Sequence, residues 1–348
     1  MKIVHVVSSL NMGGAERLVV NLSIEQKRLG HQVTVVSFGA KSDTYYTLLQ
    51  THGIAVQLVG GGLIARFTQS LKLLLAADAI NIHSTPIVRA LAPLFPMLYF
   101  KKTIFIVHGE TSPKLRLFKP AILFACLFIK HVVAVSESAR RSLYRRFAVN
   151  TGRVGIIENG VQLAATCKHA PTGPELPLKV GAVGRLIPLK NFELLIESVA
   201  IINQTDSSPI ELHIFGDGPS LEDLKTLARD QGVTVNFHGI VLEQDEIYRH
   251  IDLLVISSNT EGLPMVLIEA MARGIPAIST RVGAIPSVIV DQQNGWLIDV
   301  GNARQLQQAL AQVIHSPGCL STVGRQAYTT VEHQFSIAAV AAKYQSLY

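Results

Sequence analysis

Residues 253–272 read LLVISSNTEGLPMVLIEAMA, and this stretch decides the fold. It begins with an apolar run at Leu253–Ser257, which predicts a buried β-strand. It ends in apolar residues at helical spacing, which predict a helix at Leu267–Arg273. Pro264 suits the first turn of that helix, because no main-chain hydrogen bond is lost there. A strand, a short loop and a helix in this order form the repeating unit of a parallel α/β sheet.

Short apolar runs alternate with helical patterns along both halves of the chain. Continuous apolar strands separated by helices imply parallel sheets covered on both faces, so we expect an α/β fold with two doubly wound, Rossmann-like domains. The predicted strands are Lys2–Ser8, Gln32–Ser37, Ala79–His83, Thr103–His108, His131–Ser136, Val154–Ile157, Lys179–Val183, Glu211–Gly216, Thr234–His238, Leu253–Ser257 and Ala277–Thr280. The predicted helices include Ala15–Leu29, Phe67–Ala77, Phe192–Gln204, Leu221–Gln231, Leu267–Arg273 and Ala303–His315.

The segment Leu163–Pro177 interrupts both periodicities and predicts the linker between the domains. We therefore expect an N-terminal domain at residues 1–165 and a C-terminal domain at residues 178–330. Residues 331–348 contain a further helical pattern, at about Ile337 to Leu347, which we expect to cross back to the first domain. Since open α/β sheets bind ligands at the carboxyl ends of their strands, two facing domains would form one cleft.

Composition supports a folded, cytoplasmic protein. The 348 residues are 48% hydrophobic and 16% charged, which excludes disorder and suffices for two cores. A membrane-spanning helix needs about 20 apolar residues, and the most apolar stretch, Pro120–Ser136, is interrupted by Lys130 and His131. The first seven residues indicate a strand rather than a signal peptide. Cys126, Cys167 and Cys319 lack metal-ligand spacing, so we expect reduced thiols and no metal site.

Positive charge is concentrated in the first half of the chain. Residues 1–170 carry 20 Lys and Arg against 7 Asp and Glu, whereas the remainder carries 11 against 18. This asymmetry favours contact with an anionic membrane surface, although a solvated basic face is the plain alternative. The chain has no nucleic-acid-binding motif, so we expect no nucleic-acid partner. The dense basic cluster and its apolar neighbours are Arg140, Arg141, Arg145, Arg146, Leu117, Phe118, Ile122, Leu123, Phe124, Leu127 and Phe128.

Two glutamates flank the start of the helix that follows Ser257. Glu261 lies in the preceding loop, and Glu269 lies about one turn into the helix, where a carboxylate can accept both hydroxyls of a ribose. The amides from Gly262 to Val266 are free to bind an anion, aided by the helix dipole. A solvated side chain or a helix-terminal charge is the alternative for either glutamate.

Two cations follow the strand Lys179–Val183, namely Arg185 and Lys190. A guanidinium fork and a mobile ammonium both suit phosphate oxygens, so a diphosphate is the expected ligand. No carboxylate cluster nearby offers a Mg²⁺ site, so the cations themselves would stabilise a leaving diphosphate. The turn Gly216–Pro219 follows the next strand and permits close approach to a ligand.

Two weaker signals lie in the first half. Gly13 and Gly14 follow the first strand and permit close backbone approach, but the segment is not GxGxxG, which disfavours a dinucleotide site. His108 ends a strand, where it could hydrogen-bond a sugar hydroxyl or an acceptor, although a structural role is common for such a histidine.

Together these segments resemble the retaining glycosyltransferases of family 4, which have the GT-B fold. The resemblance covers essentially the whole chain. One position departs from the family pattern, because Ser287 stands where the family often has Glu, in Gly283–Ser287. The matching segments are Gly13–Arg17, Leu29–Thr34, His108–Gly109, Val135–Ser136, Ile157–Val161, Val183–Leu186 with Lys190, Gly216–Pro219, Glu261 with Glu269, and Gly274–Ile278.

The resemblance implies a role for each matched residue. Arg185 and Lys190 would hold the donor diphosphate, Glu269 the ribose, and Glu261 would face the donor sugar. His108 would meet the transferred sugar, and it joins Arg185, Lys190 and Glu261 in the expected catalytic set. The expected donor-binding residues are Gly13, Gly14, Gly184, Gly216, Gly218, Gly262, Leu263, Pro264, Met265 and Glu269. The family's chemistry retains the anomeric configuration without a metal, and a front-face mechanism fits this chain.

The expected function is sugar transfer from a nucleotide diphosphate sugar to a lipid-linked or glycolipid acceptor at the inner face of the cytoplasmic membrane. This would serve surface polysaccharide or lipopolysaccharide assembly. A UDP-sugar is favoured as donor, with GDP-mannose next. The alternatives are a nucleotide-sugar epimerase of the same fold, a transferase with a soluble acceptor, and a non-catalytic nucleotide-sugar-binding module.

Overall fold

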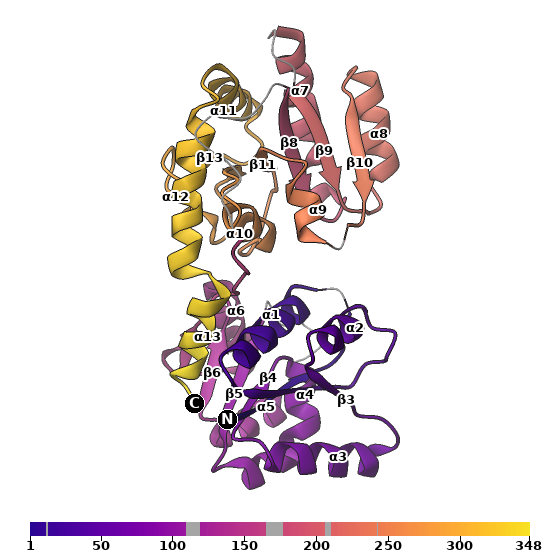
Figure 1. The fold of residues 1–348 in the computed structure, drawn as a ribbon, viewed down its shortest axis with the longest axis vertical. Coiled ribbons are helices and arrows are strands. Elements are labelled where there is room, and N and C mark those ends of the chain that lie inside the picture. The colour runs from indigo at the N-terminus through magenta and orange to yellow at the C-terminus, as the bar shows by residue number, and fades with distance from the viewer. Residues whose placement is uncertain (12, 109–118, 165–176, 206–209, 242) are drawn as a thin grey trace. The chain divides into compact units, whose positions relative to one another are not determined.

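The computed structural model describes residues 1–11, 13–108, 119–164, 177–205, 210–241 and 243–348. The chain divides into two compact units, each with its own sheet (Figure 1). Unit 1 comprises Met1–Val161 together with Ile337–Tyr348, and unit 2 comprises Gln162–Ser336.

Unit 1 is built on a seven-stranded parallel sheet in the order β3-β2-β1-β4-β5-β6-β7. On β1, Ile3 pairs with Val33 on one side and with Ala79 on the other, so the strand order reverses between β1 and β4. This reversal is the switch point at which open α/β sheets bind ligands. The strands are β1 Lys2–Val7, β2 Gln32–Ser37, β3 Ala55–Leu58, β4 Ala79–Ile82, β5 Lys102–Val107, β6 His131–Ala134 and β7 Val154–Ile156.

Separate apolar clusters pack against this sheet. One joins Val4, Ile80 and Phe105 to residues of α4, α5, α6 and the 3₁₀ segment η1, and another joins Ile104 and Ile106 to α1 and α13. The helical segments are α1 Gly14–Arg28, α2 Thr44–Thr51, α3 Leu63–Leu75, α4 Thr85–Leu91, η1 Ala92–Leu98, α5 Lys119–Phe128, α6 Glu137–Phe147, η3 Thr151–Arg153 and α13 Ile337–Gln345.

Unit 2 has a six-stranded parallel sheet in the order β10-β9-β8-β11-β12-β13. The strand order again reverses, here between β8 and β11. A large apolar cluster, including Leu195, Leu212 and Leu310, packs against this sheet. The strands are β8 Leu178–Val183, β9 Ile210–Phe215, β10 Val235–Gly239, β11 Leu253–Ile256, β12 Ala277–Thr280 and β13 Trp296–Ile298. The helical segments are η4 Pro188–Lys190, α7 Phe192–Thr205, α8 Leu221–Asp230, α9 Gln244–Tyr248, α10 Met265–Met271, η5 Ile285–Ser287, α11 Ala303–His315 and α12 Cys319–Gln334.

The predicted pair of doubly wound α/β sheets is confirmed, and every predicted strand coincides with an observed one to within two residues. The strands missed from the sequence are β3 and β13, which lie at sheet edges and are only four and three residues long. One local expectation was wrong: Pro264 precedes α10 in extended backbone, and the helix begins at Met265 rather than Leu267.

The last helix expected at about Ile337 to Leu347 is α13, and it lies in unit 1. Residues 331–336, which were expected with it, belong to unit 2, because α12 continues to Gln334. In unit 1, α13 buries Ile337, Val340 and Tyr344 against Leu18 and Leu22 of α1. Most of the predicted linker Leu163–Pro177 lies outside the described residues.

Three of the five described apolar residues beside the basic cluster are exposed. Leu123, Phe124 and Leu127 of α5 face solvent. Ile122 was expected at the surface, but it is fully buried and packs into the core. Phe128 is only half-buried, whereas Leu117 and Phe118 lie outside the described residues. None of the helices in the described part of the chain combines the length and apolar character needed to cross a membrane.

The burial of α13 predicts that it stabilises unit 1 selectively. Val340→Ala removes two buried methyl groups and should lower the free energy of unfolding by about 2 kcal/mol. In hydrogen–deuterium exchange, protection should fall in β5 and β6, while β8 and β9 stay unchanged. Ala338→Ser, on the exposed side of the same helix, is the matched control. Loss of protection in unit 2 instead would contradict the assignment of α13.

Candidate functional site

The loops that follow β8, β9 and β11 meet at the carboxyl edge of the sheet in unit 2. The amide of Gly184 donates to the carbonyl of Phe215 at 2.9 Å, and that of Leu186 donates to Asp217 at 3.0 Å. On the other side, the amide of Asn259 donates to the carbonyl of Leu189 at 2.9 Å. Three predicted segments are therefore brought to one edge.

Glycine is required where the β8 and β9 loops touch. A Cβ on Gly216 would lie 1.9 Å from the carbonyl oxygen of Gly184, and one on Gly218 would lie 2.3 Å from that of Leu186. Gly216 also has a φ of +131°, which side chains rarely adopt. The two main chains thus pack directly, without side chains between them.

Lys190 and Glu261 form an ion pair between η4 and the loop before α10. Their side chains are 23% and 11% exposed, so water screens the pair only in part. The hydroxyl of Ser258 donates to the same Glu261 oxygen at 2.7 Å. The hydroxyl of Ser257 donates to the carbonyl of Asn191 at 2.7 Å, which ties the η4 turn to the β11 loop. Lys190 is therefore fixed in place.

Arg185 lies two residues after β8 and is exposed. Among the described residues, no acidic side chain forms an ion pair with its guanidinium. The edge therefore offers one cation held by a carboxylate and a second that faces solvent.

Glu269 is buried on α10, with 9% of its surface exposed. The side-chain amide of Gln244 donates to one carboxylate oxygen, and the hydroxyl of Tyr248 donates to the other at 2.9 Å. Because two donors hold it, the carboxylate has a fixed orientation although it is buried.

Arg273 completes this network. Its guanidinium donates to Asp245 at 2.6 Å and to the main-chain carbonyl of Glu269 at 3.0 Å, and it lies 4.9 Å from the ring centre of Tyr248. Gln244, Tyr248 and Arg273 were not among the predicted site residues. The available signal was the spacing of Gln244 and Tyr248, which are four residues apart and share a face of α9. Arg273 follows α10, which ends at Met271.

The remaining predicted donor-binding residues of unit 2 line the same loop. Gly262 is exposed, Leu263 and Met265 are half-buried, and Pro264 is buried. A Cβ on Gly283 would lie 2.2 Å from the carbonyl oxygen of Glu261, and the amide of Ala284 donates to Gly262 at 2.8 Å.

The segment after β12 therefore supports the Glu261 loop from behind. Ser287, which departs from the family pattern, closes the η5 turn by donating to the carbonyl of Ala284 at 2.7 Å.

The predicted site residues of the first half all lie in unit 1. Gly13 caps α1 in extended backbone, and a Cβ on Gly14 would meet nothing within 4 Å. None of the described residues of unit 1 therefore requires glycine at position 14. His108 follows β5, at the carboxyl edge of the sheet, and Gly109 lies outside the described residues. Burial lowers the pKa of His108 to about 4, so the ring is neutral near pH 7.

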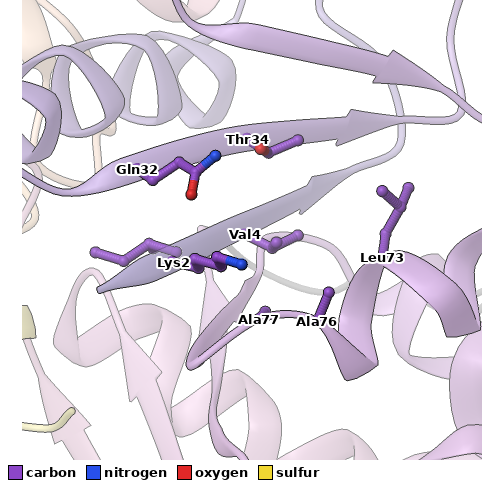
Figure 2. A pocket seen from close by; sticks show the side chains of 8 residues that line it. Lys2, Val4, Gln32, Thr34, Leu73, Ala76 and Ala77 are labelled. Atoms are coloured by element: carbon purple, nitrogen blue, oxygen red, sulfur yellow. The ribbon is translucent and has the colours of Figure 1, made fainter.

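A pocket at the opposite edge of this sheet is not a candidate site. Figure 2 shows it beside the amino ends of β1 and β2, where Lys2, Val4, Gln32 and Thr34 face Leu73 and Ala77. Parallel α/β sheets bind ligands at the carboxyl ends of strands, and those ends lie at the other edge.

Metal-binding geometry is absent from the described residues, which contain no group of three or more His, Cys, Asp or Glu placed to hold an ion. Cys126 and Cys319 are free and partly buried thiols, and burial raises the pKa of Cys126 to about 11. Cys167 lies outside the described residues.

Two doubly wound sheets with these loops define the GT-B class of glycosyltransferase folds. HepE of Anabaena, solved in complex with UDP, superposes with a TM-score of 0.82 over 99% of both chains at 18% identity. Two family models then match most of the chain: "Glycosyltransferase Family 4" at residues 12–165 and "Glycosyl transferases group 1" at residues 169–330. The chain belongs to glycosyltransferase family 4, which confirms the resemblance seen in the sequence.

Relatives of known description match over part of their length. The lipopolysaccharide core biosynthesis glycosyltransferase LpsE of Rhizobium meliloti is 31% identical over 48% of this chain and 48% of its own. The putative colanic acid biosynthesis glycosyltransferase WcaL of Escherichia coli is 27% identical over 53% of this chain and 48% of its own. The chain thus spans about half the length of the relatives it matches.

The contact at Gly216 predicts a steric effect that can be separated from backbone strain. Gly216→Ala should lower the stability of unit 2 by more than about 2 kcal/mol, because the methyl group overlaps the Gly184 carbonyl. Gly232→Ala also has a positive φ but meets nothing within 4 Å, so it should cost only the conformational strain of about 1–2 kcal/mol. Urea unfolding of both variants measures the difference, and equal costs would contradict the close contact.

Proposed function

We propose that the protein is a retaining glycosyltransferase that moves a sugar from a nucleotide diphosphate sugar to a lipid-linked or glycolipid acceptor in cell-surface polysaccharide biosynthesis. The observation that carries the proposal is the Lys190–Glu261 ion pair, whose Glu261 lies in the loop before α10, the helix that carries the buried Glu269. Family membership and the descriptions of LpsE and WcaL support the reaction class and the biosynthetic setting.

Glu269 is proposed to bind the donor ribose. Gln244 and Tyr248 each donate to one oxygen of its carboxylate, and an ionised carboxylate can accept several hydrogen bonds, including those from ribose hydroxyls. The two protein donors also offset the cost of burying the charge before the donor binds.

Lys190 and Arg185 are proposed to bind the diphosphate. One N–H of the Lys190 ammonium is committed to Glu261, which leaves two for phosphate oxygens. The exposed Arg185 would add a bidentate fork from the neighbouring loop. Such preorganised cations stabilise the charge that develops on the diphosphate as the glycosidic bond breaks.

The proposed reaction proceeds on one face of the sugar without a metal ion. The bond from the anomeric carbon to the diphosphate breaks, and the acceptor hydroxyl attacks from the same side and loses its proton to a leaving phosphate oxygen. Glu261 would face the sugar, and its pairing with Lys190 leaves it poorly suited to act as a free nucleophile. His108, Gly13 and Gly14 are also proposed to bind the donor.

A UDP-sugar is the proposed donor. HepE was solved in complex with UDP-glucose as well as with UDP, and TarM of S. aureus was solved with UDP. Because these proteins share the fold of this chain, their nucleotides support UDP as the nucleotide of the proposed donor.

The protein incubated with UDP- and GDP-sugars should release nucleotide and label lipid only when a membrane lipid extract is present. Arg185→Ala and Lys190→Ala should each reduce turnover about a hundredfold, because each removes charge stabilisation of the leaving group. Turnover is measured as nucleotide release and as radiolabel in the lipid fraction.

Lys225→Gln removes a cation on α8 that pairs with Glu222, and it serves as the matched control with unchanged turnover. Near-normal rates in both Arg185→Ala and Lys190→Ala would refute the diphosphate assignment. Conversion of the nucleotide sugar without lipid would indicate an epimerase. Labelling of a soluble acceptor would show that the acceptor is not a membrane lipid.

The membrane contact is proposed to use an apolar patch on unit 1. We define this patch as Met97, Tyr99, Phe100, Leu123, Phe124 and Leu127, all exposed. Phe100 is 88% exposed and Leu127 72%. The Tyr99 ring lies 6.4 Å from that of Phe128, which lies 5.1 Å from Phe124, so the two segments adjoin.

Basic side chains flank this patch in the sequence, including the exposed Lys102, Lys119 and Lys130. Apolar side chains beside lysines suit the headgroup layer of an anionic bilayer. Arg140 and Arg141 contribute less charge than expected, because both pair with Glu137.

The double variant Phe100→Asp with Leu127→Asp should reduce binding to phosphatidylglycerol-containing vesicles at least tenfold. It removes two apolar side chains that would be buried in the headgroup layer, and it adds two negative charges. Vesicle sedimentation at low salt measures the bound fraction. Val300→Asp alters an exposed apolar residue of unit 2 and should bind as the unaltered protein does. Equal binding by the double variant would exclude the patch as the membrane contact.

A further inference from the structure

Three histidines on neighbouring strands of unit 1 form a hydrogen-bonded chain. Nδ1 of His5 on β1 lies 2.8 Å from Nε2 of His83, and Nδ1 of His83 lies 3.0 Å from Nε2 of His108. His83 follows β4 and His108 follows β5, so the chain crosses the sheet at its switch point. Adjacent rings are stacked, with centroids 5.1 and 5.2 Å apart.

All three rings are neutral near pH 7. Burial lowers the pKa of His5 and of His108 to about 4, and burial together with its two histidine neighbours lowers that of His83 well below its usual value. A neutral imidazole has one donor nitrogen and one acceptor nitrogen. The three rings must therefore share one direction of donation, because a reversal at any single ring would place two donors or two acceptors face to face.

Gln26 on α1 sets that direction. Its side-chain oxygen lies 2.7 Å from Nε2 of His5, so Nε2 carries the proton and donates. Nδ1 of His5 then accepts from Nε2 of His83, and Nδ1 of His83 accepts from Nε2 of His108. His108 is left with a lone pair on Nδ1.

The amide of Gln26 is oriented from its other side. Its nitrogen donates to the hydroxyl oxygen of Tyr348 at 3.0 Å, and the amide nitrogen of Asn81 donates to the same oxygen at 2.5 Å. Tyr348 is held in unit 1 beside α13. In the structure the Gln26 amide has its nitrogen toward Tyr348 and its oxygen toward His5.

The free end of the chain is His108 Nδ1. This nitrogen is buried, and among the described residues it has no hydrogen-bond partner. A buried acceptor without a partner costs free energy that a ligand hydroxyl would recover. This end also lies at the carboxyl edge of the sheet, where ligands bind.

We propose that Gln26, acting through His5 and His83, fixes His108 as a hydrogen-bond acceptor toward a hydroxyl group of the bound sugar or acceptor. Gln26, His5 and His83 are then positioning residues, and the inference rests on the proposed transfer reaction only for the identity of the hydroxyl. Turning the Gln26 amide over would reverse every bond of the chain and present an Nδ1–H donor to the ligand instead.

Nuclear magnetic resonance of the full chain labelled with ¹⁵N-histidine tests the direction without any substrate. At mildly alkaline pH, the signals of His5, His83 and His108 should be those of rings protonated at Nε2 and unprotonated at Nδ1. Single His→Phe variants assign the three signals. An Nδ1–H signal for His108 in the unaltered protein would overturn the proposal.

Two substitutions of Gln26 separate direction from mere packing. Gln26→Met removes the acceptor for His5 Nε2–H, so His108 should change to the Nδ1–H tautomer. Gln26→Glu keeps an acceptor oxygen there, so the tautomers should stay as in the unaltered protein. Tyr344→Phe is the control for general perturbation, because the Tyr344 hydroxyl is buried without a partner among the described residues.

Turnover of the transfer reaction supplies the second readout. Gln26→Met should lower kcat about tenfold through the lost hydrogen bond to the ligand, whereas Gln26→Glu should retain most of it. A reversed tautomer with unchanged turnover would overturn the positioning role. Absence of transfer in the unaltered protein would instead count against the proposed function, while the tautomer measurement would still decide the direction of the chain.

Discussion

The direct contact between the main chains at Gly184 and Gly216 shapes the whole carboxyl edge of unit 2. Because no side chain can stand between them, the loops after β8 and β9 close on each other and the η4 turn follows immediately. That turn carries Lys190 to Glu261, and Ser257 ties it to the β11 loop. The positions of Lys190 and Glu261 thus depend on Gly216, where only the hydrogen atom of a glycine fits.

Each unit holds polar groups inside its structure. In unit 2 a carboxylate, Glu269, is buried and is stabilised by neutral donors from α9, with Arg273 beside it. In unit 1 a row of three buried histidine rings passes hydrogen bonds from one strand to the next. A buried charge attracts hydroxyl groups as donors, and so does a neutral acceptor nitrogen. Both arrangements therefore suit a ligand rich in hydroxyl groups.

Much of the fold could be predicted from the sequence, because buried parallel strands are continuous apolar runs. That signal fails at β3 and β13, since short edge strands bury too few residues to show a pattern. Within the candidate site, the spacing of Arg185, Lys190, Glu261 and Glu269 predicted one common edge. The pairing of Lys190 with Glu261 was not predictable, and neither were the Gln244 and Tyr248 contacts or the His5–His83–His108 chain. Those contacts join residues 20 or more positions apart, so the spacing of Gln244 and Tyr248 could indicate a shared helix face but not the residue that this face contacts.

The placement of α13 affects the order in which the chain can fold as it is synthesised. Residues 337–348 are translated after the whole of unit 2, yet they supply Val340 and Tyr344 to the interior of unit 1. Until residues 337–348 have been made, unit 1 therefore has an uncovered apolar surface on α1, β5 and β6. Unit 2, in contrast, has all its residues before that segment is translated. Domains usually fold in the order in which they emerge from the ribosome. Here unit 1 begins first but is completed after unit 2. During that interval its exposed core would be a natural binding site for a chaperone.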